Sequence, residues 1–173
     1  MLANNNLNMK NMISEKLIMA GMITILFACN SPKEESAAVA AAPVVDKEQI
    51  KKDIQAKEDE FAATYNKGVL TDIGYYADDA TNFYQNRPPV VGKKAILDFL
   101  QSDLLSNSNK IEFKTNEVFV SSDANQVVEV GSFKVIDSTN ATLNSGNYMT
   151  LFEKRNGKYV SVREMSASDM PAQ

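Results

Sequence analysis

The sequence of 173 residues contains no histidine, no tryptophan and a single cysteine, Cys29. Without histidine the chain cannot build a Ser-His-Asp or Cys-His catalytic site, an imidazole general base or a His-ligated zinc site. One cysteine cannot form an internal disulfide or a thiolate metal cluster. Any catalysis must therefore use Asp, Glu, Tyr, Lys or Arg, and we expect neither a metal nor a cofactor.

Positive charge is also scarce. The chain has 18 Lys and Arg against 22 Asp and Glu, a formal net charge of −4, and no basic block. Binding to nucleic acid requires clustered Lys and Arg that displace counterions from the phosphates. We therefore expect no nucleic-acid partner.

The N-terminal segment has the pattern of a targeting signal. Lys10 and Lys16 precede an uncharged run over residues 17–28. At about 1.5 Å per residue this run spans about 18 Å, too short for a bilayer core but suited to the apolar region of a signal peptide. It ends in Leu26-Phe27-Ala28-Cys29, which resembles a bacterial lipobox and implies cleavage before a lipidated Cys29. The alternative is an ordinary buried cysteine in an N-terminal helix.

The next segment, residues 29–45, is rich in alanine, contains Pro32 and Pro43, and shows no hydrophobic periodicity. This composition is typical of a flexible tether. The predicted organisation is a lipoprotein signal peptide over 1–28, a tether over 29–45 and one domain over 46–173. The expected location is the bacterial cell envelope, anchored by lipid to the outer membrane, with the periplasmic face and the cell surface both open.

Helices are predicted in the first half of the domain. Asp46 and Gln49 form a variant capping box for a helix that ends near Gly68, with its apolar face on Ile50, Ile54, Phe61 and Tyr65. A short second helix is predicted over 70–76 and a brief strand over 81–84. A third helix buries Ile96, Phe99 and Leu100.

Strands are predicted from residue 110 onward. The apolar alternation changes phase between Phe113 and Val118, which indicates a bulge. Further strands cover 126–137, 142–155 and 158–166, and Asn156-Gly157 is a strong hairpin signal. Helices followed by a strand meander predict an α+β domain.

Three blocks in this order, 60–68 (EFAATYNKG), 76–81 (YADDAT) and 88–96 (PPVVGKKAI), with the ending at 157–163 (GKYVSVR), resemble the nuclear transport factor 2-like superfamily. Its SnoaL-like and ketosteroid-isomerase-like domains are the most similar. The resemblance implies a cystatin-like cone, in which three N-terminal helices pack on a strongly curved, mainly antiparallel sheet around a pocket. It also implies a possible homodimer formed through the sheet.

The catalytic residues of the steroid isomerases do not carry over. By this alignment their general-base Asp falls on Tyr84, their oxyanion-hole Tyr on Phe61 and their oxyanion-hole Asp near Met149. Enolisation needs a carboxylate that accepts the proton and acids that hold the enolate oxygen. Neither Phe61 nor Met149 can serve, so we identify no catalytic residue.

The resemblance implies an aromatic, mainly apolar pocket in the domain. The alternative is that the same residues pack in the core and bind no ligand. The alignment turns Asn147, Met149 and Leu151 inward on their strand. The pocket candidates are Tyr76, Phe83, Tyr84, Phe119, Asn147, Met149 and Arg163.

The favoured interpretation is an envelope protein, lipid-anchored through Cys29, that binds a small apolar or amphipathic ligand or a protein partner without catalysis. One alternative is a SnoaL-like isomerase, cyclase or hydrolase in which Tyr84, Arg163, Glu164 or Asp169 acts as acid or base. A second alternative is a structural dimerisation module. A cavity carboxylate with a strongly raised pKa favours the enzyme.

We expect a Cys29→Ser variant to lose its membrane attachment, because the serine hydroxyl cannot form the thioether with lipid. Fractionation of cells that express the full chain checks this. A variant that still sediments with membranes contradicts the lipobox assignment.

Overall fold

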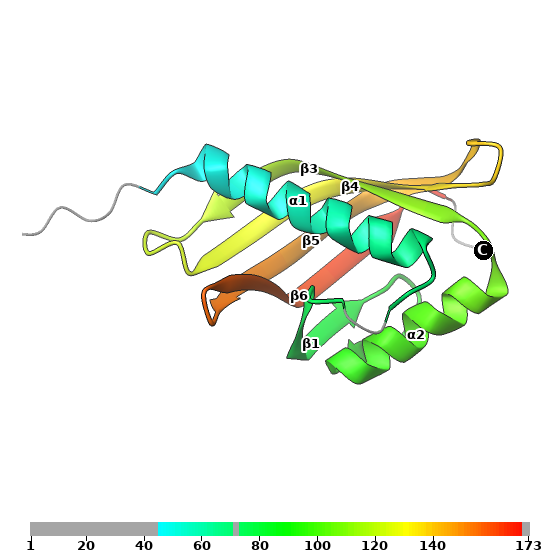
Figure 1. Ribbon diagram of the computed structural model, residues 1–173, viewed down its shortest axis with the longest axis horizontal. Coiled ribbons are helices and arrows are strands. Elements are labelled where there is room, and N and C mark those ends of the chain that lie inside the picture. The colour runs from blue at the N-terminus through cyan, green and yellow to red at the C-terminus, as the bar shows by residue number, and fades with distance from the viewer. Residues whose placement is uncertain (1–44, 71–72, 171–173) are drawn as a thin grey trace, which may run out of the picture. The chain divides into compact units, whose positions relative to one another are not determined.

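The computed structural model describes residues 45–70 and 73–170, and these form two helices and one six-stranded sheet (Figure 1). The elements in chain order are α1 (Lys47–Asn66), β1 (Tyr76–Phe83), β2 (Val90–Val91), α2 (Lys93–Ser106), β3 (Lys110–Val120), β4 (Gln126–Ile136), β5 (Thr142–Arg155) and β6 (Lys158–Ser168). The predicted signal peptide and tether, up to residue 44, lie outside the described residues. Within the described ranges no helix is long and apolar enough to cross a membrane.

The strands lie in the order β2-β1-β6-β5-β4-β3. All neighbours are antiparallel except β1 and β6, which pair in parallel and so join the first long strand to the last. The predicted α+β class and mainly antiparallel sheet are confirmed. The predicted hairpin is confirmed too, since Asn156 and Gly157 both have positive φ, 53° and 78°, as a type I′ turn requires.

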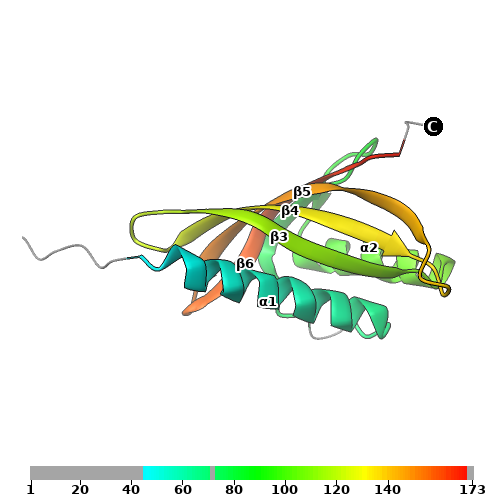
Figure 2. The ribbon, with the colours of Figure 1, turned by 90° about the horizontal axis from the view of Figure 1, so that it is seen from above.

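Helix α1 begins and ends where the sequence predicts. The Asp46 carboxylate accepts a 3.0 Å hydrogen bond from the backbone N–H of Gln49, and Gly68 follows the helix with a φ of +74°. Figure 2 shows α1 lying along one face of the sheet. The predicted apolar residues Ile50, Ile54, Phe61 and Tyr65 are all buried there, so this face of the helix forms one wall of the core.

Helix α2 lies beside β1 at the other end of the sheet (Figure 1). It buries Ile96 and Leu100, and Phe99 packs against the core cluster. The two helices therefore border a common space over the same face of the sheet.

The predicted helix over 70–76 is not formed. Ile73 to Tyr75 form a coil and turn and Tyr76 starts β1, while residues 71–72 lie outside the described residues. Pairing with β6 favours the extended backbone, because the N–H of Ser161 donates to the Tyr75 carbonyl at 2.7 Å. Two helices, rather than three, are found in the described part of the chain.

The predicted change of phase in β3 is a bulge. The pairing of β3 with β4 shifts register between Thr115 and Glu117. Thr115 is thereby turned into the core, with 4% of its surface exposed. Gln55 of α1 accepts from the Thr115 N–H at 2.7 Å and donates to the Phe113 carbonyl at 3.2 Å, which fixes the helix to this strand.

The prediction for β5 chose the wrong face. Tyr148, Thr150 and Phe152 are buried, whereas Asn147 and Met149 are exposed on the opposite face. Both faces of this strand carry large apolar side chains, so the period of two cannot decide which one faces the helix.

Gly131 on β4 provides the space that allows Tyr148 of β5 to face the core. This glycine pairs with Tyr148, and a Cβ at position 131 would lie 2.2 Å from the tyrosine ring. The ring therefore lies across the strand at a place where any side chain would block it.

We expect Gly131→Ala to destabilise the domain by about 1–3 kcal/mol, because the added methyl overlaps the buried Tyr148 ring. Urea unfolding measures the effect. Gly74→Ala is the matched control, since its added Cβ would meet no atom within 4 Å. Equal losses of stability in the two variants would contradict the close approach at Gly131.

Candidate functional site

A cavity of about 230 Å³ lies between the two helices and the inward face of the sheet. Its wall is mainly aromatic, with Phe61 from α1, Phe113 from β3 and Phe133 from β4 among the lining residues. The residues with polar groups in its lining include Tyr76, Tyr84, Asp103 and Glu164. An apolar concave wall with a few polar groups is the usual composition of a small-molecule site.

A row of polar side chains crosses the inward face of the sheet behind this cavity. Register pairs Asn82 with Glu164, Glu164 with Thr150, and Thr150 with Glu129, so these four residues lie side by side on β1, β6, β5 and β4. Asn82, Thr150 and Glu129 are at most 1% exposed. We call these four residues the polar row.

Asn82 orients two of the cavity hydroxyls. Its amide Nδ2 donates to the Tyr84 Oη at 3.1 Å and to the Tyr76 Oη at 3.4 Å. Tyr84 thus accepts from Asn82, and its own proton is donated to no acceptor among the described residues. The Tyr84 O–H can therefore donate to a molecule in the cavity.

Glu164 is the carboxyl of the polar row that reaches the cavity. Burial is the largest cause that raises its pKa to about 7; the charge of Glu129 acts in the same direction and a hydrogen bond with Tyr76 acts in the opposite direction. Near neutral pH this group exists in both protonation states, so it can donate or accept a proton.

Tyr65 and Asp103 close another side of the cavity. The Tyr65 hydroxyl donates to Asp103 Oδ2 at 2.5 Å, which links α1 to α2. Burial, with the adjacent Asp103 carboxylate, raises the pKa of Tyr65 well above its ordinary value, so the tyrosine stays protonated and holds this link.

The structure divides the predicted pocket residues between two faces. Tyr76 and Tyr84 line the cavity. Phe83, Met149 and Arg163 instead line a recess of about 210 Å³ on the opposite face of the sheet, together with Val128, Leu151 and Met165. Phe119 and Asn147 are exposed and lie outside the lining of the cavity. The reversed face of β5 and the alternation along β1 and β6 account for these misplacements.

Sequence reasoning missed two buried acids, Glu58 on α1 and Glu129 on β4, which are 1% and 0% exposed. Glu58 is one of several charged residues in its helix, yet it continues the i, i+4 spacing of Ile50 and Ile54. Glu129 shares the inward face of β4 with Val127. In both cases the acid occupies a position that the hydrophobic periodicity of its helix or strand assigns to the buried face.

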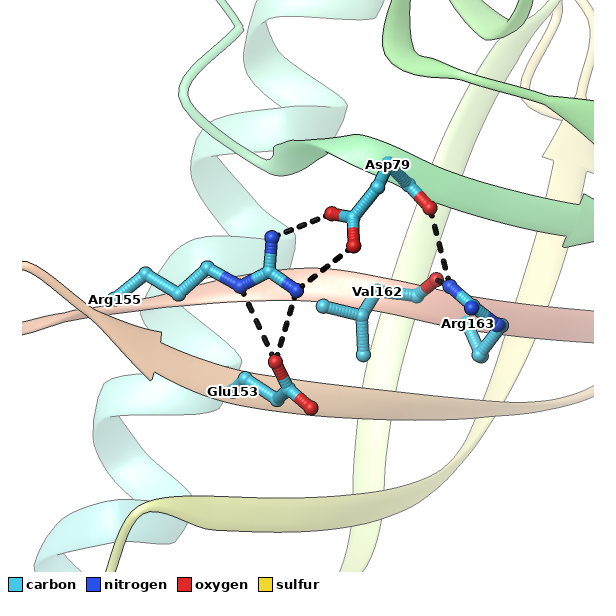
Figure 3. Close-up of polar contacts among 5 residues, drawn as sticks. All are labelled: Asp79, Glu153, Arg155, Val162 and Arg163. Carbon is cyan, nitrogen blue, oxygen red and sulfur yellow. Dashed lines mark hydrogen bonds and ion pairs between the residues drawn. The ribbon is translucent and has the colours of Figure 1, made fainter. Parts of the chain in front are cut away.

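Arg163 and Asp79 belong to a surface cluster near the β5–β6 hairpin rather than to the cavity (Figure 3). Arg155 donates to both Asp79 and Glu153, and Arg163 donates to the Asp79 backbone carbonyl at 3.1 Å. Bonding to Arg155 lowers the pKa of Asp79. The cluster ties β1 to the hairpin. In the described residues no group of three or more acidic or cysteine side chains could hold a metal ion.

No protein-family model matches the chain, and no curated protein matches it in sequence. Solved structures match its fold. A protein of unknown function from Mycobacterium tuberculosis is 17% identical, with a TM-score of 0.62 over 76% of this chain and 79% of that one. A nuclear transport factor 2-like protein with a cystatin-like fold from Novosphingobium aromaticivorans is 11% identical, with a TM-score of 0.61 over 72% and 84%.

A ketosteroid isomerase-like protein from Erwinia carotovora atroseptica is 17% identical, with a TM-score of 0.56 over 69% of this chain and 96% of that one. At such identities the likeness concerns the fold. The chain thus has the cystatin-like fold of nuclear transport factor 2-like domains, as the sequence blocks indicated.

We expect Glu164 to make the domain less stable as the pH rises from about 4.5 to 7. The unfolded chain loses this proton near the ordinary carboxyl pKa of 4.5, whereas the folded domain keeps it to about 7. Stability falls wherever the folded state binds more protons, by about 1.4 kcal/mol per pH unit for one proton. Urea unfolding at pH 4 to 8 should therefore show a shallower decline for Glu164→Gln than for the wild type.

The control for this titration is Glu112→Gln, which changes an exposed carboxyl on β3 that lies outside the cavity lining. If Glu164→Gln and Glu112→Gln give the same slope as the wild type, Glu164 does not retain its proton in the folded domain.

Proposed function

We propose that the domain binds a small, flat, mainly apolar molecule that carries a hydrogen-bond acceptor such as a carbonyl oxygen. The observation that carries this is the pair of donors in an aromatic cavity: the Tyr84 O–H, oriented by Asn82, and the protonated form of Glu164. The cavity of about 230 Å³ is smaller than the roughly 300 Å³ at which drug-sized sites begin, so the ligand has one or two rings.

The proposal includes the predicted location. A chain with a lipidated Cys29 and a tether to residue 45 would hold this cavity close to a bacterial envelope membrane. A sparingly soluble apolar ligand concentrates at such a surface, which is consistent with the aromatic wall. The periplasmic face and the cell surface both satisfy this argument.

Acid–base catalysis on the bound ligand is the second candidate function, and Glu164 favours it. A carboxyl whose pKa lies near 7 is well matched to general acid or base work at neutral pH. The steroid-isomerase positions remain unsuited, since Phe61 carries no hydroxyl and Met149 faces away from the cavity. Catalysis would therefore use Glu164 in place of the family's residues.

We also propose that the chain forms a dimer through the face of the sheet opposite the cavity, here called the outer face. Phe83, Met149, Met165 and Phe119 are 41–55% exposed there, and register places the first three side by side on β1, β5 and β6. Contiguous exposed apolar surface of this kind marks an interaction site. The face also carries Glu117 on β3 and Arg163 on β6, whose opposite charges suit antiparallel apposition of two identical faces.

Binding is tested with acetophenone, which carries a carbonyl acceptor, and ethylbenzene, which has a similar shape without one. We expect acetophenone to shift NMR signals of cavity residues and to bind more tightly than ethylbenzene. Tyr84→Phe should weaken acetophenone binding about fivefold, the value of one hydrogen bond of about 1 kcal/mol.

Tyr159→Phe is the matched control, because the Tyr159 hydroxyl donates to the Ala124 carbonyl and lies outside the cavity lining. Equal binding of the two probes, or equal effects of the two tyrosine variants, would refute the donor pair. Native mass spectrometry of protein from its own cells then identifies the natural ligand. Its turnover by wild type and not by Glu164→Gln would establish catalysis.

For the outer face, we expect light scattering to give a dimer mass for the wild type and a monomer mass for Met149→Glu, since the new carboxylate would be buried without a partner. Thr142→Glu, at the exposed start of the same strand, is the control and should remain dimeric. A monomeric wild type excludes the proposed pairing.

A further inference from the structure

Glu58 and Glu129 form a buried acid pair that the proposed binding site does not use. The two carboxyls come from α1 and β4 and lie within hydrogen-bonding reach of each other in the core. Among the described residues no ion pair joins a cation to either of them. Two carboxylates cannot both ionise at such close range in a dry interior.

The hydrogen bonds around the pair assign the proton. Glu129 Oε1 accepts from the Thr115 hydroxyl at 2.6 Å and from the Tyr148 hydroxyl at 2.8 Å. Glu58 Oε1 accepts from the Tyr75 hydroxyl at 2.5 Å. Three donors thus converge on the two carboxyls from β3, β5 and the turn before β1.

One carboxyl oxygen of the pair is left without a partner. Glu129 Oε2 accepts no hydrogen bond from the described residues if both acids are ionised. A proton on Glu58 supplies the missing donor. Glu129, which accepts from two hydroxyls, is then the charged partner, and burial together with the charge of Glu129 raises the pKa of Glu58 well above its ordinary range.

The pair lies close to the cavity carboxyl. In the polar row only Thr150 separates Glu129 from Glu164, so two strand spacings of about 4.8 Å place their backbones about 10 Å apart. The other titratable groups around Glu58 and Glu164 are the hydroxyls of Tyr75, Tyr76, Tyr84 and Tyr148, all with raised pKa values, and the Lys57 ammonium next to Glu58, whose pKa is lowered by burial. The charge on Glu129 therefore acts on Glu164 through a medium that screens it little.

We propose that Glu58 and Glu129 share a single proton and that the one negative charge they retain positions the proton of Glu164 in the cavity. This inference rests on the proposed role of Glu164 in ligand binding. Glu58 and Glu129 are positioning residues, since they act on the ligand through Glu164. The cavity thereby keeps a hydrogen-bond donor at neutral pH.

Two variants separate the charge from the packing. In Glu58→Gln the amide can donate to Glu129 Oε2, so the single negative charge is kept. In the double variant Glu58→Gln/Glu129→Gln the shape is kept and the charge is lost. The readout is the carboxyl carbon shift of Glu164 followed by NMR from pH 4 to 9 in the full chain, without ligand.

We expect the Glu164 midpoint in Glu58→Gln to stay close to that of the wild type, and the midpoint in the double variant to fall by about one pH unit. Equal midpoints in the two variants would overturn the proposal. A second measurement decides the case if the double variant does not fold: the Glu58 carboxyl of the wild type must remain protonated at pH 7, and its ionisation there refutes the shared proton.

These outcomes are independent of the ligand. If acetophenone fails to bind while the midpoints shift as expected, the binding proposal fails and the acid pair stands. If the probe binds through Tyr84 and the midpoints coincide, the binding site stands and the acid pair fails.

Discussion

The cost of burying carboxyl groups is the constraint on which this domain depends. Glu58, Glu129 and Glu164 face the same core, and desolvation is the largest cause of the raised pKa of each. Moving such groups out of water is unfavourable unless they are neutralised or hydrogen-bonded. Hydroxyls from several strands meet this need, so that the hydrogen bonds that hold the acids also hold α1, the meander and the turn before β1 together.

Small backbone irregularities make those hydrogen bonds geometrically possible. The bulge in β3 turns Thr115 inward, and Gly131 leaves room for the Tyr148 ring to cross β4 and reach Glu129. The parallel pairing of β1 with β6 then places Asn82 beside Glu164. A sheet without these features would present the same residues on the same strands, but the polar row would lack its donors.

Much of the fold was predictable because it follows local signals. The Asp46 cap, the Gly68 terminus, the β3 bulge and the Asn156-Gly157 hairpin each depend on residues close in sequence. The site was less predictable. Of the seven pocket candidates, Tyr76 and Tyr84 line the cavity, and the other five lie outside its lining. The face of β5 depends on Gly131 in another strand, and no pattern within β5 encodes it. The buried acids Glu58 and Glu129 were not predicted, because glutamate usually lies on the surface.

The central claim is that carboxylic acids remain protonated inside the folded domain at neutral pH. Infrared spectroscopy of the full chain in heavy water measures this directly, because a protonated carboxyl absorbs at a frequency distinct from that of a carboxylate. The account predicts a protonated-carboxyl band at pH 7 that disappears on unfolding at the same pH. A spectrum at pH 7 with carboxylate bands alone, unchanged by unfolding, would contradict it.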